Sequence, residues 1–253
     1  MQTLDIVDQS RDRLPAVSCL MLTSDRRQLA RRAIDHFLGQ DYNNCELIVV
    51  DSGTDPIADL IPAGDVVRYH RLDVRRSIGW TRQFACEAAS GDVLVQWDDD
   101  DWYGSHRLRR QVEPIARGDA EVSALLWDYL YDVPARRFWR RSARLRLNYL
   151  DSVVCGTLAF TRAAWQRSAG YRDVSLGEDV GMLTELVRQG ARLARVKSDG
   201  IFVCVRHSGN TWHFEPVSGS GDGEGWYEAP PPLFLSDEEI RFYNSTQSLR
   251  DRW

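Results

Sequence analysis

Residues 93–108 read VLVQWDDDDWYGSHRL, so that an apolar run continues directly into four consecutive aspartates. The first five letters are typical of a buried strand, and two aromatic residues and a basic segment follow the acids. Like charges packed this closely repel one another and attract water or a cation. We therefore expect Asp98, Asp99, Asp100 and Asp101 to lie at the rim of the core, where a cation can neutralise them.

Strand-like and helix-like segments alternate around this stretch. The expected strands are residues 16–23, 46–50, 66–72 and 93–97, and the expected helices are 26–38, 78–89 and 107–116. Continuous apolar strands that alternate with helices are typical of a parallel sheet covered on both faces. Ligands of such sheets bind outside the carboxyl ends of the strands. This rule predicts that the loops at residues 23–25, 51–53 and 98–101 lie together.

The second half of the chain has a less regular pattern. Expected strands are residues 122–131, 137–140 and 153–160, with one or two more in 195–205; expected helices are 162–168, 178–188 and a last one capped by Ser236. Residues 216–232 are rich in glycine, proline and acids and have no apolar period, which predicts a loop or lid.

Composition excludes several classes of protein. With 253 residues, 43% apolar and 27% charged, the chain is an ordinary globular protein of one large domain or two small ones. Its net charge of −5 gives no basic field for nucleic acid. No apolar run approaches the roughly 20 residues of a membrane helix. The polar amino terminus and five scattered cysteines favour a reducing compartment, so we expect a cytoplasmic protein, either free or peripheral at the inner face of the membrane.

The aspartate run suits a hard divalent cation. Mg²⁺ and Mn²⁺ prefer oxygen ligands, usually one or two carboxylates together with substrate phosphates. A D-x-D spacing after a strand lets one carboxylate bind the metal and another contact it indirectly or bind a sugar. The alternative is a solvated acidic turn. A calcium loop of the EF-hand type is excluded, because its glycine and glutamate are absent.

Other candidate residues follow neighbouring elements. Asp51, after the second strand, can accept the imide N–H of uracil or bind a ribose hydroxyl, although Asp-Ser-Gly is also common turn chemistry. Arg82, near the start of a helix, can reach a diphosphate; the alternative is an exposed helix arginine.

Two further pairs have competing interpretations. Glu178 and Asp179 open a helix, where the dipole favours acids whatever their function; one of them can also act as a general base, and only one should face a substrate. His207 and His213 are candidates for a third metal ligand, although a single histidine is more often structural.

Taken together, these segments resemble the family 2 glycosyltransferases, which have the GT-A fold. The segments that match the family pattern, in order, are AVSCLMLTSDR, Gln40 and Tyr42 before ELIVVD, GWTRQ with ASGD, DDDDW, RLRRQ, GTLAF and GED. The match runs from Ala16 to Trp212. Two positions depart from it: Ser52 replaces an acid, and Gln83 replaces the usual asparagine.

The resemblance implies an α/β protein of the GT-A fold, in which a Rossmann-like nucleotide-binding half with a mainly parallel sheet joins an acceptor-binding half. We expect a single domain over residues 15–215, with the nucleotide-sugar half at 15–117 and the acceptor and catalytic half at 118–215. Residues 1–14 would be a flexible terminus, and 216–253 a lid and a last helix.

The resemblance also implies a metal-dependent, inverting glycosyltransferase that uses Mn²⁺ or Mg²⁺ and a nucleotide-sugar, with a UDP-sugar favoured. The acceptor would be a saccharide, a lipid-linked molecule or a small molecule. The implied catalytic base is Asp179, with Glu178 beside it. The implied donor-binding residues are Thr23, Asp51, Ser52, Arg82, Asp98 and Asp99. The implied metal ligands are Asp100 and Asp98, together with His207 or His213.

Two other classes of protein are alternatives to a glycosyltransferase. A sugar nucleotidyltransferase has a related sheet and also needs a metal. It would, however, require a glycine-rich loop after the first strand to bind phosphate. That loop reads LTSDRR here and has no glycine. A non-catalytic metal-binding or carbohydrate-binding module is the other alternative.

Overall fold

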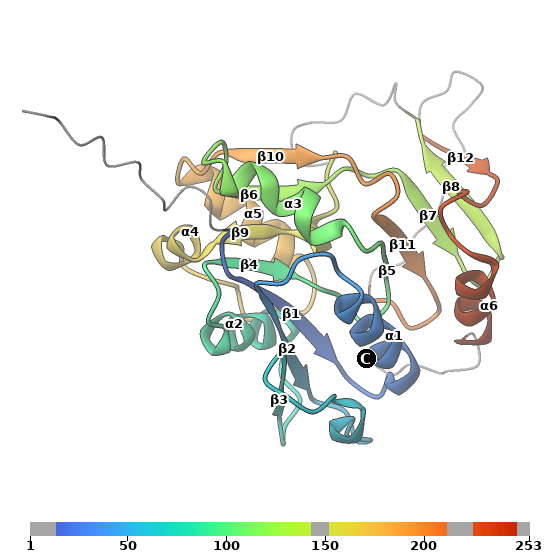
Figure 1. The fold of residues 1–253 in the computed structure, drawn as a ribbon, viewed down its shortest axis with the longest axis horizontal. Helices are drawn as coiled ribbons and strands as arrows, with labels where there is room; N and C mark the ends of the chain where they lie inside the picture. Colours follow the sequence, from blue (N-terminus) through green and yellow to red (C-terminus); the bar gives the residue numbers. More distant parts are fainter. Residues whose placement is uncertain (1–13, 143–151, 212–224, 247–253) are drawn as a thin grey trace, which may run out of the picture.

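Two sheets organise the protein (Figure 1). The computed structural model describes residues 14–142, 152–211 and 225–246. The larger sheet has seven strands in the order β10-β6-β9-β4-β1-β2-β3, and the smaller has five in the order β12-β8-β7-β11-β5. The mixed α/β class with a mainly parallel sheet confirms the expected fold class.

The larger sheet contains the alternating first half of the chain and three strands from the second half. Its strands are β1 (Val17–Thr23), β2 (Cys45–Asp51), β3 (Val67–Arg71), β4 (Val93–Gln96), β6 (Val122–Leu125), β9 (Ala159–Thr161) and β10 (Leu193–Val196). The first four run parallel, and β9 is antiparallel to both β4 and β6. Thr23 pairs with Asp51 at the carboxyl ends of β1 and β2, so the loops that follow these strands start side by side.

Helices cover both faces of this sheet. They are α1 (Arg27–Leu38), α2 (Ile78–Ala88), α3 (Arg107–Ala116), α4 (Arg162–Arg167) and α5 (Glu178–Arg188), whereas α6 (Asp237–Ser245) packs with the smaller sheet. Two 3-10 turns, η2 (Ala58–Leu60) and η3 (Cys155–Thr157), lie between these elements. Apolar side chains of α1 and α3 pack on one face, and those of α2, α4 and α5 pack on the other. Residues of β2 alternate between the two clusters, which explains why its sequence is continuously apolar.

The smaller sheet lies beside α6 (Figure 1). Its strands are β5 (Trp102–Tyr103), β7 (Tyr129–Asp132), β8 (Arg137–Arg141), β11 (Phe202–Arg206) and β12 (Trp226–Ala229). A third apolar cluster joins this sheet to α1 and to α6. Because β4 belongs to the larger sheet and β5 to the smaller, residues 98–101 lie in one of the segments that connect the two sheets.

Three sequence-based predictions of elements are corrected here. The single strand expected at residues 122–131 is two strands, β6 and β7, in different sheets. The strand expected at 153–160 is a 3-10 turn followed by β9, because the chain turns at Gly156. Part of the expected loop at 216–232 is β12, which pairs with β8; residues 216–224 lie outside the described residues.

A buried polar network explains two of the sequence motifs. Arg107 donates through Nη2 to the Gln96 carbonyl at 2.6 Å and through Nε to Gln111 at 3.2 Å. Gln111 in turn donates to the carbonyl of Thr157. The Arg107 guanidinium also lies 4.2 Å from the centre of the Tyr103 ring. The segments RLRRQ and GTLAF therefore contact each other where α3 meets η3, beside the aspartate run.

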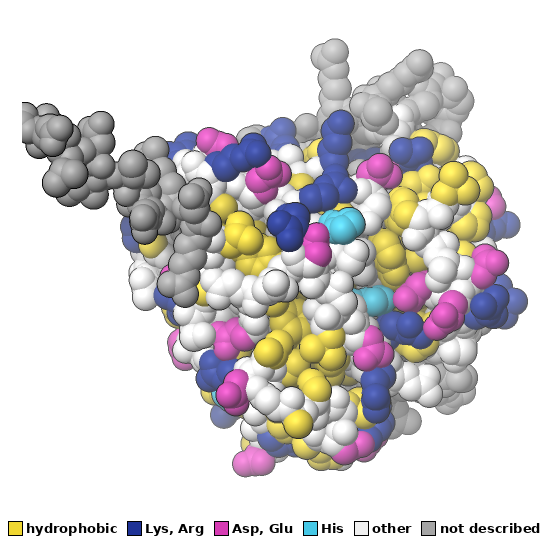
Figure 2. Space-filling view, in the orientation of Figure 1, with side chains coloured by type: hydrophobic (Ala, Val, Ile, Leu, Met, Phe, Trp, Pro, Cys, Tyr) yellow, Lys and Arg dark blue, Asp and Glu magenta, His cyan; other side chains and the backbone are white. Residues whose placement is uncertain are grey.

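The surface and the described helices agree with the composition. On the face shown in Figure 2, acidic and basic side chains are interspersed without a large area of either sign. All five cysteines are free thiols, and Cys19, Cys86 and Cys204 are buried. None of the helices in the described ranges combines the length and apolarity needed to cross a bilayer.

Candidate active site

A cavity of about 680 Å³ lies at the carboxyl ends of β1 and β4. Both sheets and the start of α5 contribute to its lining. Its charged residues are Arg26, Arg82, Asp98, Asp99, Asp100, Asp101, Arg141, Glu178, Asp179 and Arg206. The three loops predicted to meet at this edge do meet, since Thr23 contacts Asp99 and the Ser52 amide donates to the Thr23 carbonyl at 3.1 Å.

Asp98 is the most accessible of the four aspartates, with a side chain 28% exposed. Arg82 donates to it through Nη2 at 2.8 Å and to Glu178 through Nε at 3.2 Å. Arg82 is itself buried, so the interpretation of an exposed helix arginine is wrong. Its guanidinium joins the aspartate run to the acids of α5 across the cavity.

Asp99 faces the loop after β1. Its Oδ2 accepts a hydrogen bond from the Thr23 hydroxyl at 2.7 Å, and its Oδ1 accepts one from Arg26 at 3.0 Å. Burial raises the pKa of Asp99, and the charge of Arg26 offsets only part of that rise. Thr23 and Asp99, both predicted donor-site residues, are therefore in direct contact.

Asp100 is the most heavily bonded member of the run. Its Oδ2 accepts from Arg26 at 2.9 Å, from Asn210 at 2.9 Å and from the ring of His207 at 3.2 Å. Burial alone would raise its pKa, but the hydrogen bond from His207 and the charge of Arg26 outweigh burial and hold the pKa below its ordinary value. Asp100 is thus an anion with three donors on one oxygen.

The tautomer of His207 follows from its second contact. The backbone amide of Gly209 lies 3.1 Å from Nδ1, and an amide can only donate. Nδ1 therefore accepts, and in the neutral ring the proton is on Nε2, which faces Asp100. To bind a metal through Nε2, His207 would have to give up this proton.

Asp101 has a structural contact. Its Oδ1 accepts the backbone amide of Val205, in β11, at 2.8 Å. Burial raises the pKa of Asp101, and the charge of Asp100 raises it further. Three of the four aspartates are buried, so the interpretation of a solvated acidic turn does not describe them.

Glu178 and Asp179 both line the cavity. The expectation that only one of them faces a substrate stays a prediction. Gly177 precedes them with φ of +75°, a left-handed conformation that starts α5 at this position. Glu178 is held by Arg82, and Asp179 accepts the Val180 amide at 2.7 Å. Burial raises the pKa of both carboxyl groups, despite the opposing charge of Arg82. Such a shift suits a proton acceptor.

Asp51 organises the loop after β2. Its carboxylate is fully buried and accepts from the amides of Gly53 and Ile57, at 2.8 and 3.1 Å, and from the hydroxyl of Tyr69 at 2.7 Å. Neither Asp51 nor Ser52 is among the residues that line the cavity. The contact of these two residues with a nucleotide base stays a prediction.

The sequence did not single out Arg26, Arg206 or Asn210. Arg26 could have been found, because it follows Thr23 in the loop after β1, which was predicted to reach the aspartates. Asn210 gives no sequence signal, since it reaches Asp100 only through the turn that begins at His207. His213 lies outside the described residues.

The donor chemistry of the site suits a divalent cation, since carboxylates and an imidazole are suitable ligands for Mn²⁺. Within residues 14–142, 152–211 and 225–246, however, no three acidic, histidine or cysteine side chains are already assembled around one point. Asp100, the favoured ligand, has its Oδ2 occupied by protein donors. An ion that binds through this oxygen would take the place of one of these donors.

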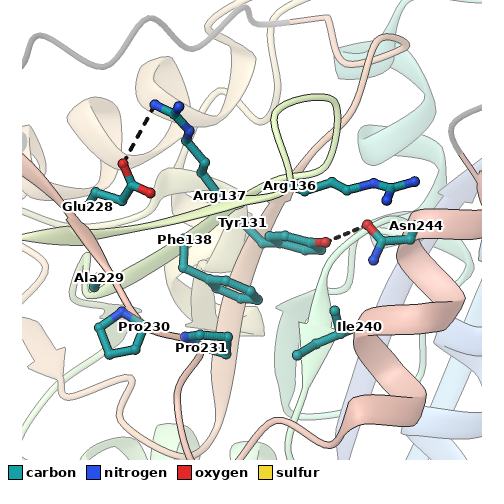
Figure 3. A pocket seen from close by; sticks show the side chains of 10 residues that line it. All are labelled: Tyr131, Arg136, Arg137, Phe138, Glu228, Ala229, Pro230, Pro231, Ile240 and Asn244. Atoms are coloured by element: carbon teal, nitrogen blue, oxygen red, sulfur yellow. Dashed lines mark hydrogen bonds and ion pairs between the residues drawn. The ribbon is translucent and has the colours of Figure 1, made fainter.

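A second cavity, of about 640 Å³, lies between β8, β12 and α6 (Figure 3). Tyr131 donates to Asn244 across it at 2.5 Å, and Arg137 pairs with Glu228 at 3.6 Å. Glu228 is the single acid among its lining residues. This cavity lacks the acidic pairs of the first, so the candidate active site is the cavity at the aspartate run.

Comparisons with known proteins show the family of the chain. A family model described as "Glycosyl transferase family 2" matches residues 18–170. The chain is 34% identical over 99 residues to a putative colanic acid biosynthesis glycosyl transferase, WcaA, of Escherichia coli, covering 37% of this chain and 36% of that protein. It is 29% identical over 201 residues to the glycosyltransferase AglD of Haloferax volcanii, covering 74% of this chain and 32% of that protein. The chain thus spans about a third of the length of these relatives.

Solved structures with the same fold include two complexes with nucleotide-sugars. S. aureus TarS, in complex with UDP-GlcNAc, has a TM-score of 0.64 and 15% identity, covering 79% of this chain and 62% of that one. A mannosyltransferase from Pyrobaculum calidifontis, in complex with GDP-Man and Mn²⁺, has a TM-score of 0.60 and 18% identity, covering 78% and 58%. At sequence identities of 18% and 15%, the structural similarity to these two proteins shows a shared fold and nothing more.

Proposed function

Because the chain belongs to glycosyl transferase family 2, whose model matches more than half of it, we propose that it transfers a sugar from a nucleotide-sugar to an acceptor hydroxyl. One observation carries the proposal. The aspartate run, the arginine that bridges Asp98 to Glu178, and two carboxyl groups with raised pKa values all line one cavity at the carboxyl edge of the sheet.

The donor side of the cavity has the chemistry that a nucleoside diphosphate needs. The guanidinium groups of Arg26, Arg82 and Arg206 lie among the aspartates, and arginine binds phosphate oxygens through paired donors. Nucleotide-sugar complexes of proteins with the same fold support this donor class. We propose a UDP-sugar as the donor, with Asp51 and Ser52 on the side of the base.

We also propose that Mn²⁺ or Mg²⁺ binds at Asp100 and Asp98, with His207 as a further ligand. When bound, the ion would neutralise charge on the departing diphosphate. The carboxylates of Asp98 and Asp100 line the cavity, and the ring of His207 lies 3.2 Å from Asp100. The Mn²⁺ complex of the mannosyltransferase structure supports a metal of this class.

Asp179 is the proposed base. Its carboxylate takes the proton from the acceptor hydroxyl while the acceptor oxygen forms a bond to the anomeric carbon and the bond from that carbon to the diphosphate breaks. Direct displacement inverts the configuration and needs no covalent nucleophile. Glu178 is less suited to this role because Arg82 holds its carboxylate, so it is proposed to position Arg82.

Binding of nucleotides tests the proposal. UDP, GDP, TDP and CDP, each with and without Mn²⁺, are added to the wild type, to Asp100→Asn and to a control, Glu228→Gln, in the second cavity. A ligand that binds the native state raises its melting temperature by mass action. We expect a metal-dependent rise with UDP that is lost in Asp100→Asn and kept in Glu228→Gln. No rise with any nucleotide in the wild type would contradict the proposed donor class.

A further inference from the structure

The guanidinium of Arg26 occupies the position next to the proposed metal ligand. Its Nη1 lies 2.9 Å from Asp100 Oδ2 and 3.0 Å from Asp99 Oδ1, and its Nη2 lies 2.9 Å from the carbonyl of Gly209. The side chain is 5% exposed. Arg26 is therefore a buried cation that is shared by two carboxylates of the aspartate run.

The three donors on Asp100 Oδ2 differ in how firmly they are held. The turn at residues 207–210 fixes two of them, because the His207 amide donates to Asn210 Oδ1 at 2.6 Å and the Gly209 amide donates to His207 Nδ1 at 3.1 Å. Arg26 reaches Asp100 through a long side chain that starts in the loop after β1, and it also donates to Asp99 and to the carbonyl of Gly209. Its departure would break these hydrogen bonds but would leave both hydrogen bonds within the turn at residues 207–210 intact.

Charge also selects Arg26 as the group that must leave. A carboxylate oxygen can accept two or three hydrogen bonds, but a divalent ion beside a guanidinium adds a strong repulsion between like charges at low dielectric. Neutral His207 and Asn210 add no such repulsion. The buried acids Asp99 and Asp100, in turn, need a nearby cation, whether it is Arg26 or a metal.

We propose that Arg26 is a built-in counter-ion that competes with a divalent cation for Asp100 and moves to the diphosphate when a nucleotide binds. The competition with the cation stands on the contacts alone, whereas the transfer to a diphosphate rests on the proposed function. Arg26 keeps the buried aspartates neutralised in the free protein. It also makes metal binding weak until an anion arrives, so that the metal and the nucleotide bind with positive coupling.

Mn²⁺ alone is the probe for the competition. The signal of free Mn²⁺ in electron paramagnetic resonance is followed during titration of the wild type, Arg26→Gln, Arg26→Lys and Arg141→Gln. Arg141 lines the same cavity, so its variant makes the same change in charge away from Asp100. We expect Arg26→Gln to bind Mn²⁺ roughly tenfold more tightly than the wild type or more, within the range of about 5- to 150-fold that is typical of coupled sites.

The other variants identify the place and cause of this gain. Arg26→Lys keeps the charge and should bind Mn²⁺ about as weakly as the wild type, and Arg141→Gln should show little of the gain. Adding Asp100→Asn to Arg26→Gln should remove it. If Arg26→Gln binds Mn²⁺ no more tightly than the wild type, or if Arg141→Gln gains as much, competition at Asp100 is contradicted.

A second variant, which keeps the net charge unchanged, is the control for an effect of the substitution on folding. Arg26→Gln leaves two buried carboxylates without this partner, so Arg26→Gln with Asp99→Asn removes one charge of each sign and keeps Asp100. This double variant should also bind Mn²⁺ more tightly than Asp99→Asn alone, and equal affinities would contradict the inference.

A repeat of the titration with UDP separates the two proposals. In the wild type, UDP should tighten Mn²⁺ binding, and in Arg26→Gln this effect should shrink. A gain in Arg26→Gln without any effect of UDP or the other nucleotides would support the competition and contradict both the transfer to a diphosphate and the proposed donor class.

Discussion

Gly156 leaves no room for a side chain next to Asp98 in the candidate active site. A Cβ atom at position 156 would lie 2.9 Å from Asp98 Oδ2, which is nearer than carbon and oxygen atoms tolerate. The glycine of GTLAF is therefore needed for space next to an aspartate. Since Arg82 holds the same carboxylate at 2.8 Å, the position of Asp98 depends on contacts from two sides.

Gly156→Ala should displace the Asp98 carboxylate and lower sugar transfer by roughly 10- to 100-fold, because misplacement of a site group by about 1 Å can cost that much. The unfolding free energy should change little, since the crowded atom is the end of a side chain. Kinetics and chemical denaturation measure the two effects. Gly39→Ala is the control, because its nearest neighbour would lie at an ordinary 3.4 Å; equal losses in both variants would refute the steric reason.

The pH dependence of transfer should report the carboxyl group of Asp179. A base acts only when deprotonated, so the rate falls as pH decreases through its pKa. Burial raises the pKa of Asp179, and the fall should therefore begin at a higher pH than for an exposed aspartate, whose pKa is about 3.9. The profile of kcat against pH measures this acidic limb.

Substitution separates Asp179 from its neighbour. Asp179→Asn should lower kcat by about 10²- to 10⁴-fold and abolish the acidic limb, while nucleotide binding persists. Glu178→Gln, which weakens the contact with Arg82, should keep the limb. The reverse result would make Glu178 the base.

At the scale of elements, capped helices present the site residues. Ser77 caps α2 by accepting the Trp80 amide at 3.0 Å, and Thr161 caps α4 by accepting the Ala164 amide at 3.1 Å. The two caps have the same chemistry, but only α2 carries a charged residue of the candidate active site, Arg82. The start of α2 therefore affects both stability and the site.

Ser77→Ala and Thr161→Ala should each lower the unfolding free energy by about 0.5–2 kcal/mol, which is typical of a lost cap. Only Ser77→Ala should also weaken nucleotide binding, because fraying of α2 disturbs Arg82. Denaturation curves and calorimetry test the pair. Equal affinities in the two variants would show that the cap does not influence Arg82.

At the scale of the whole molecule, the two sheets meet around one buried arginine. Arg107 is 0% exposed, and it bonds Gln96 at the end of β4 while it lies over Tyr103 of β5. The link between these strands is the aspartate run itself. The network around Arg107 therefore stabilises the junction on which the candidate active site is built.

Arg107→Met should lower the unfolding free energy by about 2–4 kcal/mol, because it leaves buried acceptors without a donor. Arg109→Met, on the same helix, removes an exposed ion pair with Asp41 and should cost about 0–1 kcal/mol. Urea denaturation measures both. Similar costs would mean that the buried network contributes no more than a surface contact.

Local sequence patterns determined the larger sheet and its edge. Short segments of the sequence contain the apolar runs of β1, β2 and β4 and the helical spacing of apolar residues between them. These local patterns are sufficient to predict a parallel sheet that is buried on both faces. The same patterns placed residues 23–25, 51–53 and 98–101 at one edge. They also identified Arg82, Glu178 and Asp179 as candidates, and all three line the cavity.

Only the tertiary structure decided the smaller sheet and the partners of the aspartates. β5 and β12 are short, and they exist because they pair with β11 and β8, which lie far away in the sequence. In the same way, Arg26 and the turn at residues 207–210 meet on Asp100 from opposite parts of the chain. A run of four aspartates predicts that a cation is needed, but which cation neutralises it depends on contacts between distant residues, and these form only when the two sheets close around the site.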